Sequence, residues 1–473
     1  MLEATDQPKP PAGTTQGQLP QTLGSMKRIL IVNGILAVAI GYCVGLMAYA
    51  AWNHGRLVTG RVAVVVYFLL PASLALFFLR ALWGRSALKN QLALALVSLG
   101  VALFLAELFV ALYRHMSDPD VVRDRLCQQM DKEYDTRSRR EVVLSFRAQG
   151  MDAVPVITAH HFYTGKKTLE IGGSPVIPLG GISNVRTVFC NECGTYLAYD
   201  SDEHGFHNPR GLYSVGAIEI AVLGDSFVQG ACVPSNQNIA AYLRWQFPKT
   251  INLGGAGNGP LCMLGTLAEF AQPLRAKNVF WFYYEENDLA DLEGEKASLL
   301  SRYLESSYSN GLLNLQAEID AGLRSIIAEE IENAPPFQAP RLFKDALLLR
   351  GSRGLVNDSL GLENSPDYDL VLFEEVLRVA RERAQAYGGR LFFVYLPTYA
   401  RFLKPTSSIL EKHRWLVRGA VENLGIPCID ICDVFSQHYD PLSLFPFRTP
   451  GHYTPEAYRM VAEAVLKCLE NTK

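Results

Sequence analysis

The sequence predicts an α/β protein, with an N-terminal three-helix transmembrane anchor followed by a doubly wound parallel-sheet α/β/α domain that carries a helical insertion. Two observations lead to this prediction. Three long apolar runs follow one another near the N-terminus. Further along the chain, five short runs rich in β-branched and aromatic residues alternate with helical stretches, as strands do in a parallel sheet covered on both faces.

The first element is the anchor, residues 26–114. Residues 29–52 and 62–79 carry no charge, and residues 91–113 carry only Glu107. A helix needs about 20 apolar residues to cross the hydrocarbon core. We therefore expect three spans, at about 29–52, 62–83 and 91–113, after a disordered tail over residues 1–25 that is rich in Pro, Gln, Gly and Thr.

The orientation follows from the basic residues that flank the three runs. Lys27, Arg28, Arg80, Arg85 and Lys89 lie on one side, and Arg56, Arg61 and Arg114 lie on the other. The positive-inside rule then favours a cytoplasmic N-terminus. The large C-terminal part is expected in the periplasm or outside the cell.

The rest of the chain divides into two parts. Residues 115–216 are predicted to form a stalk and an irregular accessory segment, because Gly and Pro interrupt its short apolar runs. Residues 217–473 are predicted to form the α/β domain. Its expected strands are 217–223, 251–253, 278–284, 391–396 and 426–431, its expected helices include 370–387 and 455–469, and its insertion, about 293–369, has expected helices at 313–332 and 341–349.

Polar residues follow several of the predicted strands. The first strand ends in Gly224-Asp225-Ser226. Ligands bind at the carboxyl ends of parallel strands, so Ser226 would face a cleft. Taken alone, the tripeptide favours a helix N-cap role for this serine.

Three further segments lie at the ends of strands or the starts of helices: 252–260 with Gly257, 284–289 with Asn287, and 451–456 with His452. All could meet at one edge of the sheet. In this order the segments resemble the SGNH (GDSL-type) hydrolase superfamily over residues 218–469. Residues 201–209 also resemble a segment found upstream of the serine in membrane-anchored bacterial members.

The resemblance implies a role for each motif residue. Ser226 would attack an ester carbonyl while His452 takes its proton. The backbone N–H groups of Ser226 and Gly257 and the side-chain amide of Asn287 would form the oxyanion hole.

The sequence departs from the family pattern at two positions. Glu285 replaces the glycine ahead of the Asn-Asp pair, and Thr449 occupies the usual position of the acid before the histidine. Three readings stay open: a Ser226–His452 dyad held by a backbone carbonyl, a substitute acid, or reduced or lost activity. The candidate substitute acids are Asp433, Asp440 and Glu286.

No metal or cofactor is expected. The CxxC at 190–193 and the CxxxC at 428–432 do not have paired zinc-ligand spacing, which leaves core cysteines or a disulfide as the interpretation. His160 and His161 are adjacent, so on an extended segment their side chains point apart. A formal net charge of −3 gives no reason to expect a nucleic-acid partner.

The resulting functional hypothesis is a multi-pass membrane-anchored serine esterase that hydrolyses acyl esters, including O-acetyl esters, with an acylated envelope glycan as one candidate substrate. Two alternatives remain. One is an O-acyltransferase that modifies an envelope polysaccharide and works with a membrane partner. The other is a catalytically degenerate glycan-binding protein, suggested by Thr449.

Overall fold

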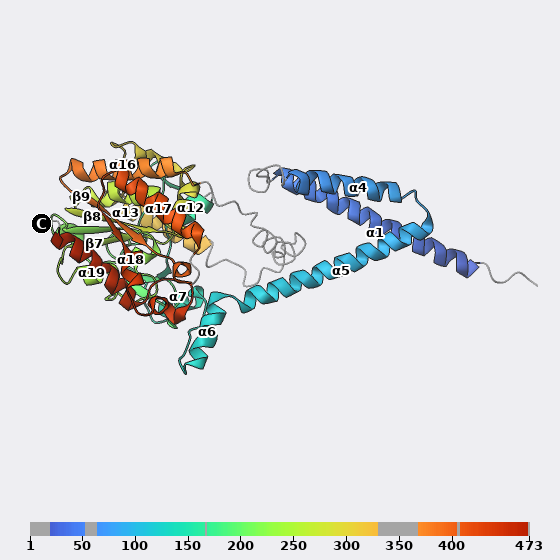
Figure 1. The fold of residues 1–473 in the computed structure, drawn as a ribbon, viewed down its shortest axis with the longest axis horizontal. Coiled ribbons are helices and arrows are strands. Elements are labelled where there is room, and N and C mark those ends of the chain that lie inside the picture. The colour runs from blue at the N-terminus through green and yellow to red at the C-terminus, as the bar shows by residue number, and fades with distance from the viewer. Residues whose placement is uncertain (1–18, 53–63, 166–167, 330–367, 404–406, 472–473) are drawn as a thin grey trace, which may run out of the picture. The chain divides into compact units, whose positions relative to one another are not determined.

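The computed structural model describes residues 19–52, 64–165, 168–329, 368–403 and 407–471. The chain divides into two compact units, with the boundary between Tyr113 and Arg114. The first unit contains the N-terminal apolar helices and the second contains the α/β sheet (Figure 1). Each unit is described separately.

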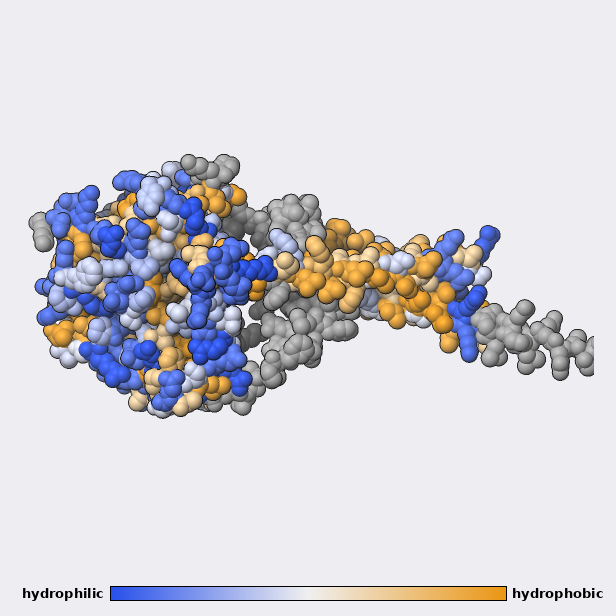
Figure 2. Space-filling view, turned by 90° about the horizontal axis from the view of Figure 1, so that it is seen from below, coloured by the Kyte–Doolittle hydropathy of each residue, from blue (hydrophilic) through white to orange (hydrophobic). Residues whose placement is uncertain are grey.

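The N-terminal unit consists of long apolar helices. They are α1 (Leu19–Trp52), the π-helix Val65–Leu69 that continues into α4 (Leu70–Ala81), and α5 (Ser86–Met116), which runs across the unit boundary. Hydrophobic side chains cover much of their surface, whereas the α/β unit shows a mainly hydrophilic face (Figure 2). Exposed apolar surface of this extent suits a lipid environment.

Two helices in the described part of the chain are long and apolar enough to cross a membrane, Met26–Trp52 and Ser86–Arg114. The middle apolar helix, Val65–Ala81, is shorter than the roughly 20 residues that a span requires, so the structure gives two candidate spans where the sequence predicted three. The predicted disordered tail also ends earlier than expected, because α1 begins at Leu19; residues 1–18 lie outside the described part.

The second unit is built on a five-stranded sheet in the order β10-β9-β8-β6-β7, and every neighbouring pair of strands is parallel. The strands are β6 (Ile220–Gly224), β7 (Thr250–Gly254), β8 (Asn278–Tyr284), β9 (Arg390–Leu396) and β10 (Cys428–Asp430). The predicted parallel α/β fold is therefore confirmed. Gly224 pairs with Gly254, so the segments after β6 and β7 leave the same edge of the sheet.

Helices cover both faces of this sheet (Figure 1). Successive residues of β6 alternate between two hydrophobic clusters, as a pleated strand requires. Ala221 and Leu223 pack in the cluster that includes α11 (Pro260–Thr266), α16 (Leu370–Ala386) and α17 (Ser408–Asn423). Ile220 and Val222 pack in the cluster that includes α10 (Ile239–Leu243), α18 (Ile431–Ser436) and α19 (Pro455–Asn471).

The segment between the apolar helices and the main sheet is more ordered than a stalk. It contains α6 (Pro119–Gln129), α7 (Arg139–Ala148), β1 (Ala153–Pro155), α8 (His160–Gly165), β2 (Leu169–Ile171), β3 (Ser174–Val176), β4 (Arg186–Val188) and β5 (Ala198–Asp200). Strands β1, β4 and β5 form a second small sheet. Val154, Phe162 and Leu179 join the same core as β6, so this segment is part of the α/β unit.

The predicted insertion is described only in part. Two short 3₁₀ helices, Leu299–Leu304 and Leu312–Asn314, precede α13 (Gln316–Ile327), which falls within the predicted helix at 313–332. The second predicted helix, 341–349, lies outside the described residues.

Candidate active site

Ser226 lies at the start of a short helix at the carboxyl edge of the sheet. Strand β6 ends at Gly224, and Asp225 caps α9 (Ser226–Gln229) by accepting a hydrogen bond from the Phe227 N–H at 2.9 Å. The cap belongs to Asp225, so the Ser226 hydroxyl is not used as an N-cap. The serine is left free to interact with another side chain.

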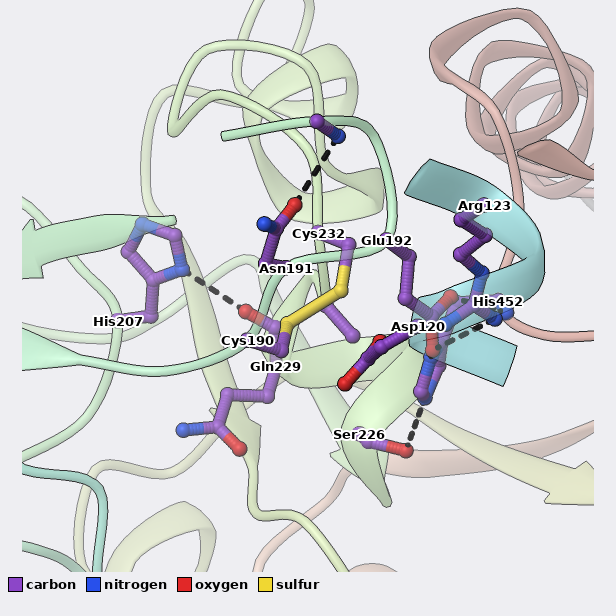
Figure 3. Close-up of a disulfide and its surroundings, with 12 residues drawn as sticks. Asp120, Arg123, Cys190, Asn191, Glu192, His207, Ser226, Gln229, Cys232 and His452 are labelled. Carbon is purple, nitrogen blue, oxygen red and sulfur yellow. Dashed lines mark hydrogen bonds and ion pairs between the residues drawn. A yellow bond between two sulfur atoms is a disulfide. The ribbon is translucent and has the colours of Figure 1, made fainter. Parts of the chain in front are cut away.

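That side chain is His452. Its Nε2 lies 2.7 Å from Ser226 Oγ, although 226 residues separate the two positions in the chain. His452 comes just before α19, on the loop that leads into this helix. The structure thus brings together the two residues that the sequence proposed as nucleophile and base (Figure 3).

The opposite ring nitrogen of His452 contacts a carboxylate that the sequence analysis did not consider. Nδ1 lies 2.9 Å from Glu192 Oε1, and the backbone N–H of His452 donates to Glu192 Oε2 at 2.8 Å. Glu192 lies on the loop between β4 and β5. Two contacts to one carboxylate fix both the ring and the backbone of His452, and they favour the tautomer with a proton on Nδ1.

Arg123, from α6, also contacts this carboxylate (Figure 3). Its Nη2 lies 3.6 Å from Glu192 Oε1 and donates to the Pro450 carbonyl at 2.9 Å. Gly451 allows this approach: a Cβ there would lie 2.7 Å from Arg123 Nη2 and 2.8 Å from Glu192 Oε2. The acid is therefore held by a buried cation at a position where a larger residue would clash.

The charges of this cluster shift its pKa values in opposite directions. Burial raises the pKa of Glu192, but His452 and then Arg123 outweigh burial and bring it down to about 2. Burial lowers the pKa of His452, but Glu192 outweighs burial, so the pKa of the imidazole lies above its usual value. At neutral pH Glu192 is a carboxylate placed to stabilise an imidazolium.

The three substitute acids considered from the sequence lie elsewhere. Asp433 pairs with Arg414 at 2.6 Å, and Asp440 pairs with Arg448. Glu286 accepts hydrogen bonds from Tyr284 Oη at 2.8 Å and Thr398 Oγ1 at 2.5 Å. Each of these three carboxylates is therefore bound by a side chain other than His452. The acid that contacts the imidazole is Glu192.

Thr449 and Glu285, the two residues that depart from the expected motifs, each have hydrogen-bond partners of their own. The Thr449 hydroxyl donates to the Pro446 carbonyl at 2.9 Å, within its own turn. Glu285 is buried, forms an ion pair with Arg401, and accepts hydrogen bonds from Tyr395 Oη and the Thr398 N–H, each at 2.7 Å. Glu285 thus ties the end of β8 to the segment that follows β9.

The proposed oxyanion donors have the following surroundings. In the part of the chain that the structure describes, the backbone N–H groups of Ser226 and Gly257 have no hydrogen-bond acceptor. Asn287 Nδ2 donates to Asp291 Oδ2 at 3.0 Å, which uses one of its two N–H groups. Burial, followed by the charge of Asp225, raises the pKa of Asp291 to about 7.

The loop that contains Gly257 is supported by the accessory segment. Gly257 has φ of +74°, a left-handed conformation that glycine adopts without strain. Its carbonyl accepts a hydrogen bond from Tyr163 Oη at 2.6 Å, and His160 Nδ1 lies 2.9 Å from the same hydroxyl. The adjacent histidines of the sequence therefore begin α8, and His160 lies beside Gly257.

The loop is held at its other end by Glu295 of α12 (Asp288–Glu295). This buried carboxyl group accepts hydrogen bonds from the N–H groups of Gly259 and Leu261 at 2.8 Å each, and so caps α11. Burial raises the pKa of Glu295 to about 8, so the cap acts at neutral pH through these hydrogen bonds and not through a full negative charge. The glycine loop is thus fixed on both sides.

One group near the site has the residue types of a metal site. Ligand atoms of Glu192, Cys232 and His452 lie within 4.8 Å of one another. However, Cys232 is bonded to Cys190 in a disulfide and cannot supply a thiolate, and the other two residues are bound to each other. This arrangement fits proton transfer better than metal binding.

Sequence patterns did not reveal Glu192, Arg123 or the Cys190–Cys232 pair as part of the site. The available signal was an acid inside the Cys190–Cys193 motif, in a chain that lacks the acid near its histidine. The motif is interpreted above as core cysteines or a disulfide, without a role for Glu192, because spacing along the chain does not show which residues lie opposite one another.

The sequence matches no known family profile and no curated protein. Solved structures similar to this chain include a member of the lipolytic protein G-D-S-L family from Veillonella parvula (12% identity, 54% of this chain and 99% of that chain covered, TM-score 0.30). Others are the lipase/acylhydrolase from Enterococcus faecalis (12%, 54% and 97%, TM-score 0.31) and a mutant of Axe2, an acetyl-xylooligosaccharide esterase from Geobacillus (12%, 54% and 94%, TM-score 0.30). At these values, the function has to be inferred from the site of this chain.

Proposed function

We propose that this protein is a serine esterase of the SGNH/GDSL type that hydrolyses acyl esters, O-acetyl esters among them. The observation that carries the proposal is the continuous chain of contacts from Ser226 Oγ through His452 to Glu192, at 2.7 and 2.9 Å. A serine, an imidazole and an acid in this order form an activated nucleophile on many unrelated folds.

In the proposed reaction, Ser226 Oγ bonds to the ester carbonyl carbon while His452 Nε2 accepts the hydroxyl proton. Glu192 stabilises the imidazolium that results. The Ser226 and Gly257 N–H groups and the side-chain amide of Asn287 would stabilise the oxyanion. The imidazolium then protonates the departing alcohol, and water, activated by His452, cleaves the acyl-enzyme to release the acid and regenerate Ser226.

We further propose that the protein is membrane-anchored and that its active site faces an oxidising compartment, the periplasm or the cell exterior. Helices α1 and α5 have the required length and apolarity. Disulfides persist mainly outside the cytosol, and the Cys190–Cys232 bond lies beside the site. Recovery of the protein in membranes after an alkaline carbonate wash, with protection from protease added on the cytoplasmic side, would support this location.

The two alternatives differ in how the structure bears on them. An O-acyltransferase would use the same acyl-enzyme, with a sugar hydroxyl in place of water, so it remains a second candidate. A degenerate glycan-binding protein was suggested by the missing acid at Thr449, and Glu192 beside His452 removes that reason.

The test uses the full chain in detergent or nanodiscs, with p-nitrophenyl acetate as substrate and a fluorophosphonate probe. We expect turnover and labelling in the wild-type protein and neither in Ser226→Ala. Equal labelling of the two proteins would refute the proposal. Acetyl transfer to an added glycan at the expense of free acetate would identify the transferase instead.

A further inference from the structure

The Cys190–Cys232 disulfide connects the two ends of the proposed catalytic triad. Cys190 precedes Glu192 by two residues, and Cys232 follows Gln229, the last residue of the helix that Ser226 begins, by three residues. The bond therefore joins the loop of the acid to the segment of the nucleophile. Figure 3 shows the disulfide alongside Glu192, His452 and Ser226.

The disulfide is close to the groups that react. Cys232 Sγ, a carboxylate oxygen of Glu192 and a ring nitrogen of His452 all lie within 4.8 Å of one another. Cys232 is buried in a small hydrophobic cluster with Phe189, Leu197, Tyr199 and Ala231. A displacement of this sulfur would therefore also shift the Glu192 carboxylate.

The carboxylate of Glu192 is held by the ring and the backbone N–H of His452, at 2.9 and 2.8 Å, while its own loop is held by other contacts. Arg123 contacts the carboxylate at 3.6 Å, beyond ordinary hydrogen-bond length. Backbone bonds hold the loop at its base, where Leu197 N–H donates to the Cys190 carbonyl at 2.8 Å, and the Asn191 side chain accepts the Gly194 N–H at 3.0 Å. These contacts order the loop itself, whereas the disulfide ties it to the segment after Ser226.

We propose that the Cys190–Cys232 disulfide is a positioning element for the acid, so that esterase activity depends on its oxidation state. This inference rests on the proposed function. A dithiol reductant would break the S–S bond, giving the Cys190 and Cys232 thiols while its own two thiols become a disulfide. The hydrogen bond between Glu192 and His452 Nδ1 would then be formed in a smaller fraction of the molecules. In the remaining molecules the imidazole would lack its ionic partner.

The experiment is a double-mutant cycle on the intact protein. We expect reduction by dithiothreitol, or the Cys190→Ser/Cys232→Ser change, to lower kcat/KM for p-nitrophenyl acetate at least tenfold. In a Glu192→Gln background the same treatments should lower it less than twofold, because the acid is already lost. Equal proportional losses in both backgrounds would show that the disulfide serves only general stability, and would overturn the proposal.

Two controls accompany the cycle. Cys193→Ser removes the exposed neighbouring thiol but keeps the disulfide, so it should retain the wild-type response to reduction. Circular dichroism and thermal unfolding of the reduced protein show whether it stays folded; reoxidation should restore activity.

A further readout separates this inference from the proposed function. The pKa of His452 can be followed by NMR of labelled histidine whether or not the protein turns over an ester. We expect a lower pKa in the folded, reduced protein than in the oxidised protein, because Glu192 no longer stabilises the charged ring. An unchanged His452 pKa refutes the positioning role, whereas a shifted pKa in a protein without esterase activity refutes only the proposed function.

Discussion

Replacing Glu192 by glutamine is the most direct test of the site. The substitution keeps the size of the side chain and removes its charge. In the structure, one carboxylate accepts both the ring Nδ1–H and the backbone N–H of His452. A glutamine has only one acceptor oxygen, so one of these two donors would face its NH₂ group. The ring would lose its ionic partner, and where the NH₂ group faces Nδ1 it would also lose its preferred tautomer.

The size of the effect follows from what the acid does. The loss of the acid in a serine triad costs up to about 10⁴ in kcat, chiefly through the wrong tautomer. Here the backbone N–H of His452 competes for the remaining oxygen, and Arg123 loses its ion pair with Glu192 while keeping the one with Asp120. We expect kcat to fall by about 10²–10⁴, or ~3–5 kcal/mol of transition-state stabilisation at 1.36 kcal/mol per tenfold change.

The assay compares kcat and KM for p-nitrophenyl acetate over pH 5 to 9. Matched controls are Asp433→Asn and Asp440→Asn, which neutralise the acids that the sequence had suggested. We expect these two variants to stay within about twofold of the wild type, since their carboxylates pair with arginines instead of His452. Glu192→Gln at wild-type kcat, or a large loss in either control, would refute the assignment.

Four further predictions concern the same site. The wild-type kcat/KM should rise with pH through a value above 6.5, because the base acts only when neutral and Glu192 raises its pKa; in Glu192→Gln this limb should move to lower pH. Asn287→Ala should lower kcat by ~10²–10³ with little change in KM, and a change in KM alone would contradict an oxyanion role. Gly451→Ala should lower kcat at least tenfold, because the new Cβ meets Arg123 and Glu192 at 2.7 and 2.8 Å; wild-type kcat in a folded variant would count against the packing argument. Tyr163→Phe removes the hydrogen bond to the Gly257 carbonyl, about 1 kcal/mol, and should lower kcat several-fold, which Tyr163→Trp would not restore.

The parallel sheet, Ser226 and His452 could be predicted because their signals are local. Each strand is a short apolar run that ends at a turn, and each motif residue follows a strand or precedes a helix. Strands that are parallel place these ends on one edge, so the proximity of Ser226 and His452 follows from topology without any pairwise information.

The acid could not be predicted in this way. Glu192 is 260 residues from His452 and belongs to a loop between two short strands of a different sheet. Its place depends on how the accessory segment packs against the main sheet, and no periodicity encodes that packing. The three acids proposed from the sequence lie near His452 along the chain or in the motif segments, yet local partners such as Arg414 and Arg448 engage two of them.

The second apolar run, residues 62–83, shows that apolar composition does not determine the length of a helix. The composition of residues 62–83 is apolar throughout. In the described part of the chain, however, the apolar helix extends only from Val65 to Ala81, the last residue of α4. A hydropathy pattern gives the apolar character of a segment. It does not give the helix ends that decide whether the segment spans a bilayer.

The contacts that the accessory segment makes with the active site change where the functional unit begins. The sequence motifs alone place it at residues 217–473, with everything before that as stalk and accessory structure. However, Glu192, Arg123 and Tyr163 all come from the earlier segment, and that segment also fills part of the core behind β6. A chain starting at residue 217 would keep Ser226 and His452, but it would lack the acid, the arginine that contacts it and the hydroxyl that holds the Gly257 loop. The smallest unit that can contain the proposed catalytic machinery therefore includes α6 and starts near Arg114, where the α/β unit itself begins.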